Sequence, residues 1–347
     1  MVGRMAEIGV ILSGIGGVGK DLTRLLSARP GYKLAAAYTR NPELAGRDLG
    51  EHAGISSLGV EIVTDRAGAL AQPADLLVVA TTSFLQDVAE DVRAGIHGGL
   101  NVITTAEEAA FPWIIDAQLA DELNHLAEAH RVSVIGLGLN PGFVFDALLL
   151  TASAVAWDVE SIRIRRVVDV SRFSAAVLRR IGIGHTEEEF EAGVAAGSIT
   201  GHIGFPQTFS LAARCLGRGL DRVEKHLEPF IAKKRIESDN LSVETGETGG
   251  FLQRVVGFVD EVSWFEAEFI AHLHLPAVEM NAQDSISIEG YNPIHLTIDP
   301  GCNPQLGTVA MLANCIPRVV EAKPGFITVA DLAIPFARET LPGIRFS

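Results

Sequence analysis

The sequence has few aromatic residues, few cysteines and no long apolar run, and each shortage argues against a class of protein. Aromatic residues make up 6% of the chain against 35 glycines, which suits close-packed α/β layers better than a β-sandwich. The three cysteines, Cys215, Cys302 and Cys315, form no C-x-x-C pair and predict reduced thiols. Apolar runs such as Leu76–Ala80 are far shorter than the roughly 20 residues that span a bilayer. We therefore expect a soluble, cytoplasmic protein.

Basic residues are also in short supply. The chain has 28 Lys and Arg against 43 Asp and Glu, a net charge of −15, whereas nucleic-acid binding requires a basic surface. In contrast, 48% of the 347 residues are hydrophobic, enough for a sizeable core, and the length favours two domains. These values predict a folded protein of two domains that does not bind nucleic acid.

The first 140 residues alternate short apolar runs with helical segments such as 115–130. Continuous apolar strands separated by helices indicate a parallel sheet covered on both faces, which is a doubly wound Rossmann arrangement. We expect this dinucleotide-binding domain over residues 1–141, with a C-terminal return over about 306–347 that begins with a helix near Thr308–Val319. Six strands are expected, at Ile8–Leu12, Lys33–Tyr38, Val60–Val63, Leu76–Ala80, Asn101–Thr104 and Val132–Ile135.

The pattern changes after residues 140–142. Residues 142–305 predict an α+β domain with a largely antiparallel sheet, which would bind substrate and form an oligomer interface. The segment Thr186–Glu189 fits a capping box, so its acidic residues are expected to open a helix rather than bind metal. A helix is expected over Asp146–Val155, and strands over Ser161–Asp169, Phe251–Val259, Glu266–Leu275 and Ser285–Ile288.

Residues 12–21, LSGIGGVGKD, contain two overlapping phosphate-binding patterns. A P-loop requires Ser or Thr after its lysine to bind Mg²⁺, and Asp21 stands there instead. The dinucleotide pattern G-x-G-x-x-G is complete and lies between the first strand and a helix, whose free N–H groups favour a pyrophosphate. The loop therefore predicts dinucleotide binding by Gly14, Ile15, Gly16, Gly17, Val18 and Gly19.

The end of the second strand bears on the choice between NAD and NADP. NAD sites usually place an acidic residue here, but the chain reads Tyr38-Thr39-Arg40-Asn41-Pro42. Arg40 and Thr39 can pair with a 2′-phosphate, which favours NADP. NAD remains possible if Arg40 is only a solvated side chain.

Polar residues follow the later strands, at the sheet edge where ligands bind in this fold. We expect Thr81, Thr82, Thr104 and Asn140 to contact the cofactor. A carboxylate of the Glu107-Glu108 pair can hold an ammonium or iminium group while hydride leaves the adjacent carbon. The alternative is that Glu107 and Glu108 only open the next helix.

Other chemistries have weaker support. No G-x-S-x-G elbow is present. His272 and His274 share a strand face without further ligands at metal-binding spacing, so no metal site is expected. Arg163, Arg165 and Arg166 could bind an anionic substrate group, or they could form the solvent-exposed face of a strand.

Six segments of the chain match a known family: the glycine loop, NPELAGRDLGEHAG, NVITTAEEAAFPW, GLGLNPGFVFDALLL, GHIGFPQTFSLAARCLG and IPRVVEAKPGFITVADLAIP. Through them the chain resembles the 2,4-diaminopentanoate dehydrogenase family, whose relatives include the native amine dehydrogenases and which shares the architecture of dihydrodipicolinate reductase. The resemblance covers nearly the whole chain. One departure is Leu12-Ser13, where family members often carry Trp-Gly or Tyr-Gly.

The resemblance implies reversible interconversion of a small amine and ammonia plus a ketone or aldehyde with NAD(P), by a homodimer. It implies that Glu107 binds the reacting amine. It further implies that Arg166 meets a substrate carboxylate, and that the pocket also includes Glu108, Asn140, Pro141 and Thr308. Three alternatives remain at this point: an NADP-dependent carbonyl reductase, an imine reductase of the dihydrodipicolinate reductase type, and a cofactor-binding protein without turnover.

Overall fold

The computed structural model describes residues 7–337, and the chain divides into two compact units. One unit comprises the residues up to Phe143 together with those from Pro304 onward, and the other comprises Val144–Asn303. The second unit is thus inserted into the chain of the first. The expected division, after residues 141 and 305, differs from these bounds by two residues at each end.

The first unit contains a parallel sheet of seven strands in the order β15-β6-β5-β4-β1-β2-β3. This order confirms the Rossmann prediction, and the six strands expected in the first 140 residues are all present, joined by a seventh from the C-terminal segment. The additional strand, β15, is three residues long, too short for an apolar run to distinguish it from a loop. The strands are β1 Ile8–Ser13, β2 Tyr32–Tyr38, β3 Ile62–Val63, β4 Leu76–Val79, β5 Asn101–Thr104, β6 Ser133–Gly136 and β15 Gly325–Ile327.

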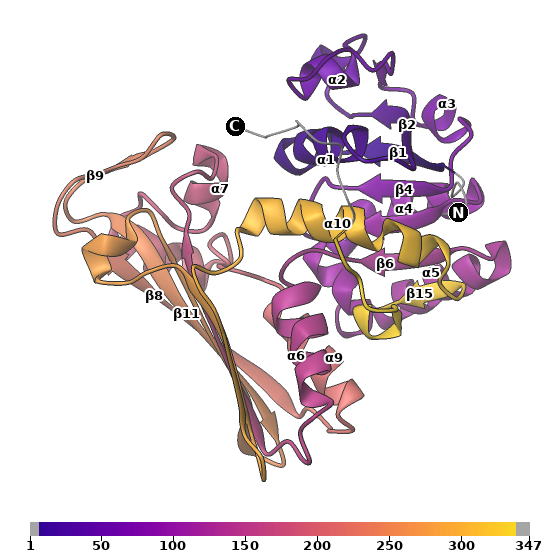
Figure 1. Ribbon diagram of the computed structural model, residues 1–347. Helices are drawn as coiled ribbons and strands as arrows, with labels where there is room; N and C mark the ends of the chain where they lie inside the picture. The colour runs from indigo at the N-terminus through magenta and orange to yellow at the C-terminus, as the bar shows by residue number, and fades with distance from the viewer. Residues whose placement is uncertain (1–6, 338–347) are drawn as a thin grey trace. The chain divides into compact units, whose positions relative to one another are not determined.

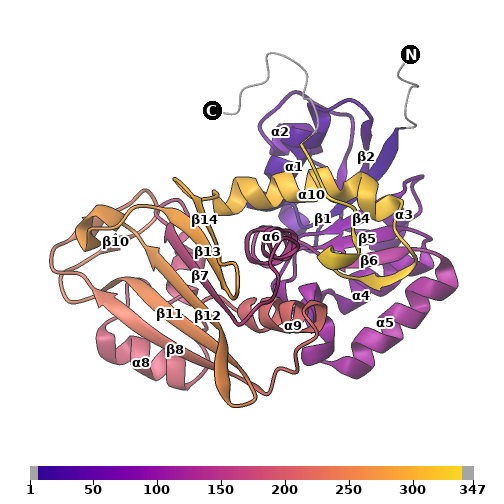
Figure 2. The same cartoon turned by 60° about the horizontal axis from the view of Figure 1, so that its bottom comes forward.

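Helices cover both faces of this sheet (Figure 1). On one face α1 and α10 pack against each other, and on the other α4 packs against α5 (Figure 2). The central strands are consequently apolar on both sides, and Val10, Ile11 and Leu12 are at most 1% exposed. The helices are α1 Gly17–Ser27, α2 Leu49–His52, α3 Arg66–Leu70, α4 Leu85–His97, α5 Ala117–His130 and α10 Pro304–Val320, with short turns η1 Pro42–Leu44, η2 Glu107–Ala110, η3 Pro112–Ile114 and η6 Val329–Asp331.

The second unit contains a mixed sheet of six strands in the order β14-β13-β7-β12-β11-β8. Strands β7 and β12 are parallel, and the other neighbouring pairs are antiparallel. This arrangement confirms the predicted largely antiparallel sheet. Its strands are β7 Ser161–Asp169, β8 Arg222–Ile231, β11 Thr248–Val259, β12 Val262–His272, β13 Gln283–Glu289 and β14 Ile294–Ile298, and β9 Ile236–Glu237 pairs with β10 Ser242–Val243.

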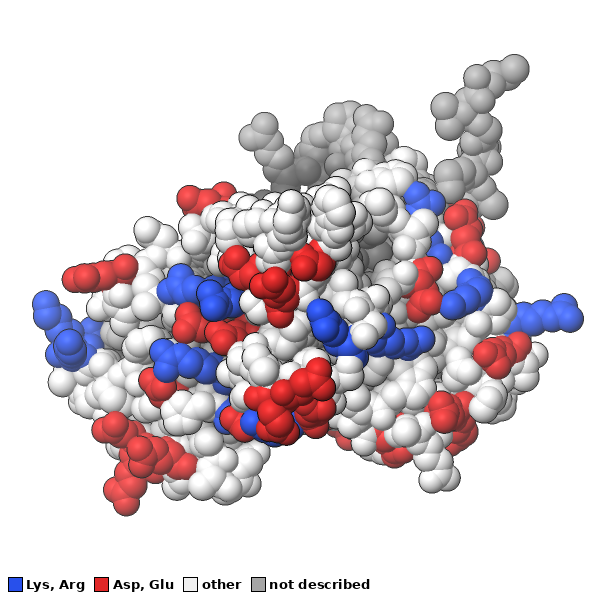
Figure 3. Space-filling model, turned by 90° about the horizontal axis from the view of Figure 1, so that it is seen from below, with Lys and Arg blue, Asp and Glu red and all other residues white. Residues whose placement is uncertain are grey.

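The two faces of this sheet differ in chemistry. Phe209 of α9 (Phe205–Cys215) stacks on Phe265 of β12, with ring centroids 4.0 Å apart, so one face is apolar. Side chains alternate along a strand, so Arg163 and Arg165 of β7 lie on the other face and pair with exposed glutamates of β12. These two arginines therefore lie on the solvent-exposed face of the second sheet. Acidic and basic side chains are interspersed across the molecular face drawn in Figure 3.

Local signals in the second unit were partly correct. Thr186 forms the predicted capping box with Glu189 at the start of α8 (Glu187–Ala195). The strand expected over Glu266–Leu275 ends at His272, because Leu275 opens a 3₁₀ turn, η5 Leu275–Val278, with Pro276 inside it. The helix expected over Asp146–Val155 begins as a π-helical turn, η4 Phe143–Ala147. It continues as α6 Leu148–Ser153, and α7 Ala175–Arg180 follows β7.

Candidate functional site

Three glycines shape the loop between β1 and α1. Gly14 has a φ of +85°, and a Cβ there would lie 2.3 Å from the carbonyl oxygen of Ala80. A Cβ on Gly19 would lie 2.2 Å from the carbonyl oxygen of Gly14. Around Gly16, in contrast, no atom lies within 4 Å of the Cβ position. Gly14 and Gly19 are thus required by the fold itself, whereas Gly16 leaves open space at the surface of the loop.

A cavity of about 710 Å³ lies beside this loop. It brings together seven of the predicted cofactor residues: Gly14, Ile15, Gly16, Thr39, Arg40, Thr81 and Thr82. Its other walls are residues that sequence reasoning did not assign to the cofactor, namely Ser13, Lys20, Asn41, Leu44, His52, Ala80 and Asp87.

The start of α1 fits an anionic group. Its N-cap residue is Gly16, no side chain caps it, and no acidic residue lies in its first turn. The first N–H groups of a helix carry partial positive charge and favour phosphate. His52 steadies the loop from α2, with its Nε2 atom 3.0 Å from the carbonyl oxygen of Ile15. The open space at Gly16 and the uncapped helix therefore fit the pyrophosphate of a dinucleotide.

A second, smaller cavity of about 200 Å³ lies within the same unit. It brings together five predicted site residues from four segments, which shows that the sheet edge gathers them as expected. The predicted residues are Val18, Glu107, Asn140, Pro141 and Thr308, and the remaining walls are Thr105, Ala106, Leu137, Gly138 and Leu139.

The loop after β6 is held in place by α10. The hydroxyl oxygen of Thr308 accepts a hydrogen bond of 3.2 Å from the backbone N–H of Leu139. The peptide bond between Asn140 and Pro141 is cis, and Gly142 next to it has a φ of +135°. Thr308 therefore both lines the cavity and fixes the segment that carries Asn140.

The two consecutive glutamates after β5 are used differently. Glu108 accepts a hydrogen bond of 2.8 Å from the backbone N–H of Leu85 and thereby caps the start of α4. Glu107 lines the smaller cavity, and its Oε1 atom accepts a hydrogen bond of 3.2 Å from the Ser83 hydroxyl. The geometry thus separates the two readings of this acidic pair: the helix-opening role falls to Glu108, and Glu107 faces the cavity.

Thr104 lies outside both cavities. Its side chain is fully buried, and its hydroxyl oxygen accepts a hydrogen bond of 3.2 Å from the N–H of Ala106. It therefore shapes the turn that presents Glu107, and its contact with a cofactor stays a prediction. The same holds for Glu108 as a substrate ligand, because Glu108 does not line the smaller cavity.

Arg166 belongs to the second unit, where it is 2% exposed. Its guanidinium donates to the Asp284 carboxylate at 2.8 Å and to the carbonyl oxygen of Cys302, also at 2.8 Å. Burial lowers its pKa, and the neighbouring Asp284 opposes that shift. The charge of Arg166 thus has a partner within its own unit, and its role toward a substrate carboxylate stays a prediction.

Residues from distant segments complete the site. The contacts of Ser83 with Glu107 and of His52 with Ile15 were not predicted, because they span 24 and 37 residues and no local pattern reveals them. Among residues 7–337, no helix has both the length and the apolar content needed to cross a membrane. Over the same range, no group of three or more His, Cys, Asp or Glu side chains is arranged to hold a metal ion.

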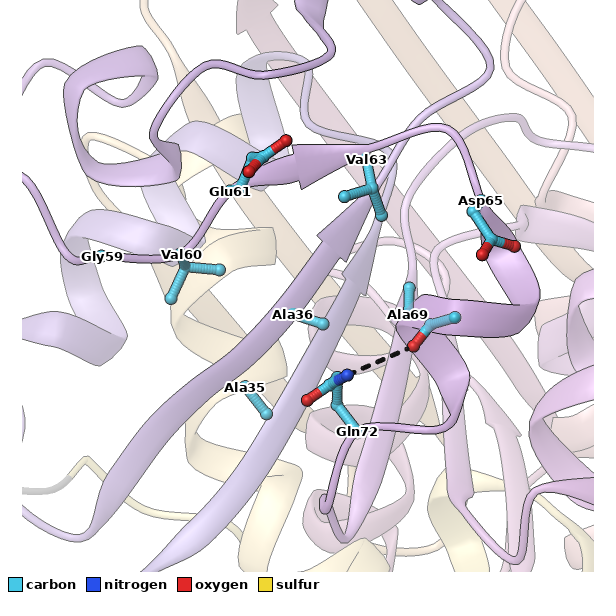
Figure 4. A pocket seen from close by; sticks show the side chains of 10 residues that line it. Ala35, Ala36, Gly59, Val60, Glu61, Val63, Asp65, Ala69 and Gln72 are labelled. Atoms are coloured by element: carbon cyan, nitrogen blue, oxygen red, sulfur yellow. Dashed lines mark hydrogen bonds between the residues drawn. The ribbon is translucent and has the colours of Figure 1, made fainter.

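A third cavity, of about 350 Å³, lies at the outer edge of the parallel sheet (Figure 4). Small residues of β2 and α3, including Ala36 and Ala69, form its base, and Glu61 and Asp65 stand at its rim. The amide of Gln72 donates to the carbonyl oxygen of Gly68 at 3.5 Å. None of the predicted site residues lines this cavity.

Comparison with known proteins places the chain among dehydrogenases. It is 29% identical to 2,4-diaminopentanoate dehydrogenase of Acetoanaerobium sticklandii, over 96% of this chain and 95% of the relative. It is 25% identical to an amine dehydrogenase of Streptomyces virginiae, over 94% and 96%. The solved structure of an amine dehydrogenase from Mycobacterium smegmatis has the same fold, with a TM-score of 0.86, 24% identity and coverage of 96% and 98%.

The fold and the glycine-loop cavity define a Rossmann oxidoreductase that binds a pyridine nucleotide, and the family model for the N-terminus of dihydrodipicolinate reductase matches residues 8–105. A second model, for the C-terminal domain of 2,4-diaminopentanoate dehydrogenase, matches residues 143–341. The chain belongs to the 2,4-diaminopentanoate dehydrogenase family.

Proposed function

We propose that this protein is an NAD(P)-dependent amine dehydrogenase that interconverts a small amine or diamino acid with ammonia and the corresponding ketone or aldehyde. The observation that carries the proposal is the position of Glu107, a carboxylate in the smaller cavity beside Val18 of the glycine loop. The acid next to it, Glu108, caps α4 and leaves Glu107 as the acid that faces this cavity.

The residues of the site supply binding, orientation and charge. Glu107 holds the substrate nitrogen and stabilises the cationic iminium that forms when the adjacent carbon loses hydride. Ser83 fixes the direction of the Glu107 carboxylate through the 3.2 Å hydrogen bond. Asn140 and Thr308 line the same cavity as Glu107. A bound nicotinamide supplies or accepts the hydride.

We further propose a preference for NADP, with NAD as a weaker substitute. Arg40 lines the larger cavity, its side chain is 69% exposed, and Thr39 and Asn41 beside it carry no negative charge. An arginine in this position can bind a 2′-phosphate, which an acidic residue would repel.

The substrate remains small in this proposal, because the Glu107 cavity measures about 200 Å³. A compound resembling 2,4-diaminopentanoate is the leading candidate, in line with the family, and Arg166 is its predicted carboxylate partner. Assembly as a homodimer and a cytoplasmic location belong to the same proposal and stay predictions.

The test is NADPH oxidation at 340 nm with a panel of small ketones and aldehydes, with and without ammonium. We expect oxidation that requires both a carbonyl compound and ammonium. Oxidation that is indifferent to ammonium would instead identify a carbonyl reductase and would leave Glu107 without its proposed partner. A cyclic imine is added to the panel as a separate substrate. Oxidation with this imine alone would identify a reductase of the dihydrodipicolinate type, and nucleotide binding without any turnover would identify a sensor.

A further inference from the structure

One buried acid close to the larger cavity has no place in the chemistry described so far. Asp91 lies in the middle of α4 and is 1% exposed. An ionised carboxylate removed from water is costly unless hydrogen-bond donors surround it. The contacts that Asp91 makes therefore indicate what it is for.

Three side chains from two segments, the end of β2 and the start of α3, donate to Asp91. The Tyr38 hydroxyl lies 2.9 Å from Oδ1, and Nη1 of Arg66 lies 3.3 Å from the same oxygen. Nη2 of Arg40 lies 3.1 Å from Oδ2. Burial, reinforced by the Asp91 carboxylate, raises the pKa of Tyr38 above its usual value, so its hydroxyl remains a donor.

The two arginines have donors to spare. A guanidinium carries five N–H groups, and the contact with Asp91 uses one nitrogen of each. The side chain of Arg40 is 69% exposed and that of Arg66 is 40% exposed, so both groups also face solvent. Arg40 makes one further contact, of 3.4 Å, with the carbonyl oxygen of Asp87.

The charge balance around this cluster is positive at its core. Two guanidinium groups share one buried carboxylate. Glu90, 3.5 Å from Arg66, is 76% exposed and therefore well screened by water. Asp87 accepts a hydrogen bond of 3.2 Å from the Thr82 hydroxyl. Because Asp91 already holds Arg40 and Arg66 in place, an incoming phosphate would not have to order mobile side chains on binding.

We propose that Asp91 is a positioning residue that fixes Arg40 and Arg66 as a paired receptor for the 2′-phosphate of the dinucleotide. This inference rests on the proposed NADP preference and extends it to two residues that do not line the cavity. The alternative effect of Asp91, direct repulsion of the phosphate, is weaker here because Asp91 is buried and both of its carboxylate oxygens accept hydrogen bonds, two of them from charged guanidinium groups.

The test is equilibrium titration of the purified protein with NADPH and with NADH, followed by nucleotide fluorescence. For Asp91→Asn we expect about tenfold weaker binding of NADPH and an unchanged affinity for NADH, the size expected for loss of one charge-assisted contact. Arg66→Gln, a change at a partly exposed residue, should weaken NADPH binding in the same direction by about threefold. Glu122→Gln is the matched control, because this carboxylate of α5 pairs with Arg93 of α4, the helix that carries Asp91, and neither residue lines either cavity.

The outcomes separate the inference from the proposal on which it rests. A wild-type protein that binds NADPH and NADH equally rejects the cofactor preference together with the phosphate receptor. A wild-type protein that discriminates, combined with an Asp91→Asn variant that discriminates equally well, overturns only the positioning role. Equal losses for both nucleotides in Asp91→Asn would mark Asp91 as purely structural, and unchanged NADPH binding in Arg66→Gln would remove Arg66 from the receptor.

Discussion

At the residue scale, the end of β5 gives two chemically identical neighbours different tasks. Glu107 faces a cavity and Glu108 caps a helix, although both follow the same strand. A sequence pattern shows that an acid is present here but not which way each carboxylate points. That direction depends on Ser83 and Leu85, which are remote in the chain.

This division of tasks is tested by paired substitutions. We expect Glu107→Gln to retain the fold and nucleotide binding and to lower turnover by at least about a hundredfold, because the charge that stabilises the iminium is lost. Glu108→Gln should act mainly on thermal stability, since it weakens the cap of α4. Steady-state kinetics and melting curves of both variants decide the matter, and a larger kinetic loss in Glu108→Gln would reverse the assignment.

The glycine loop allows a second comparison between like residues. Gly16→Ala adds a methyl group to open space, so we expect a melting temperature close to that of the wild type but at least roughly tenfold weaker NADPH binding, because backbone approach is blocked. Gly19→Ala places its Cβ against the carbonyl oxygen of Gly14 and should lower the melting temperature by several degrees, roughly 4 °C or more. Calorimetry and nucleotide titration of both variants provide the measurement. Tight NADPH binding by Gly16→Ala would refute the role assigned to that open space.

At the element scale, the segment between β2 and β3 depends on one carboxylate. Asp48 accepts hydrogen bonds from the backbone N–H groups of residues 50, 51, 58 and 59 and from the Ser57 hydroxyl. Burial opposes ionisation, but these hydrogen bonds prevail and lower the pKa of Asp48 from its usual 3.8 to about 2. One side chain thus ties both ends of this loop to the start of α2.

This shift predicts a pH dependence of stability. Because its pKa is lower in the folded protein, ionised Asp48 stabilises the folded state. The contribution of Asp48 to the free energy of unfolding is complete above about pH 4 and disappears as the pH falls toward 2. Asp48→Asn should therefore unfold at a lower urea concentration than the wild type at pH 7, and the difference should shrink between pH 4 and pH 2. Glu43→Gln in the preceding exposed turn is the control. A difference that persists unchanged at pH 2 would contradict the prediction.

Elements whose pattern is local were the ones that could be predicted from the sequence. The apolar strands of the parallel sheet and the capping box at Thr186 both arise from interactions within a few residues. β15 and the charged strand β8 have no such local signature, and they form because neighbouring strands supply their hydrogen bonds. The same reasoning applies to Asp91, whose partners lie 25 to 53 residues away.

At the scale of the whole molecule, the prediction of class was more complete than the prediction of contacts. The glycine loop, the acid-free end of β2 and the polar residues at the strand ends follow from the topology of a doubly wound sheet. Arg166 shows where this reasoning stops. Its sequence neighbourhood suited an anion-binding role, but the partner that the structure assigns to it, Asp284, lies 118 residues away on β13.

The insertion of the second unit has a consequence for the order in which the protein is made. β6 precedes residues 144–303 on the ribosome, and its sheet partner β15 follows them, as does α10. At about 5–20 residues per second, the edge of the parallel sheet waits on the order of ten seconds for its last strand. Thr308 also emerges only then, so a nascent chain released before Pro304 lacks one wall of the Glu107 cavity. Premature termination should therefore yield fragments without amine dehydrogenase activity.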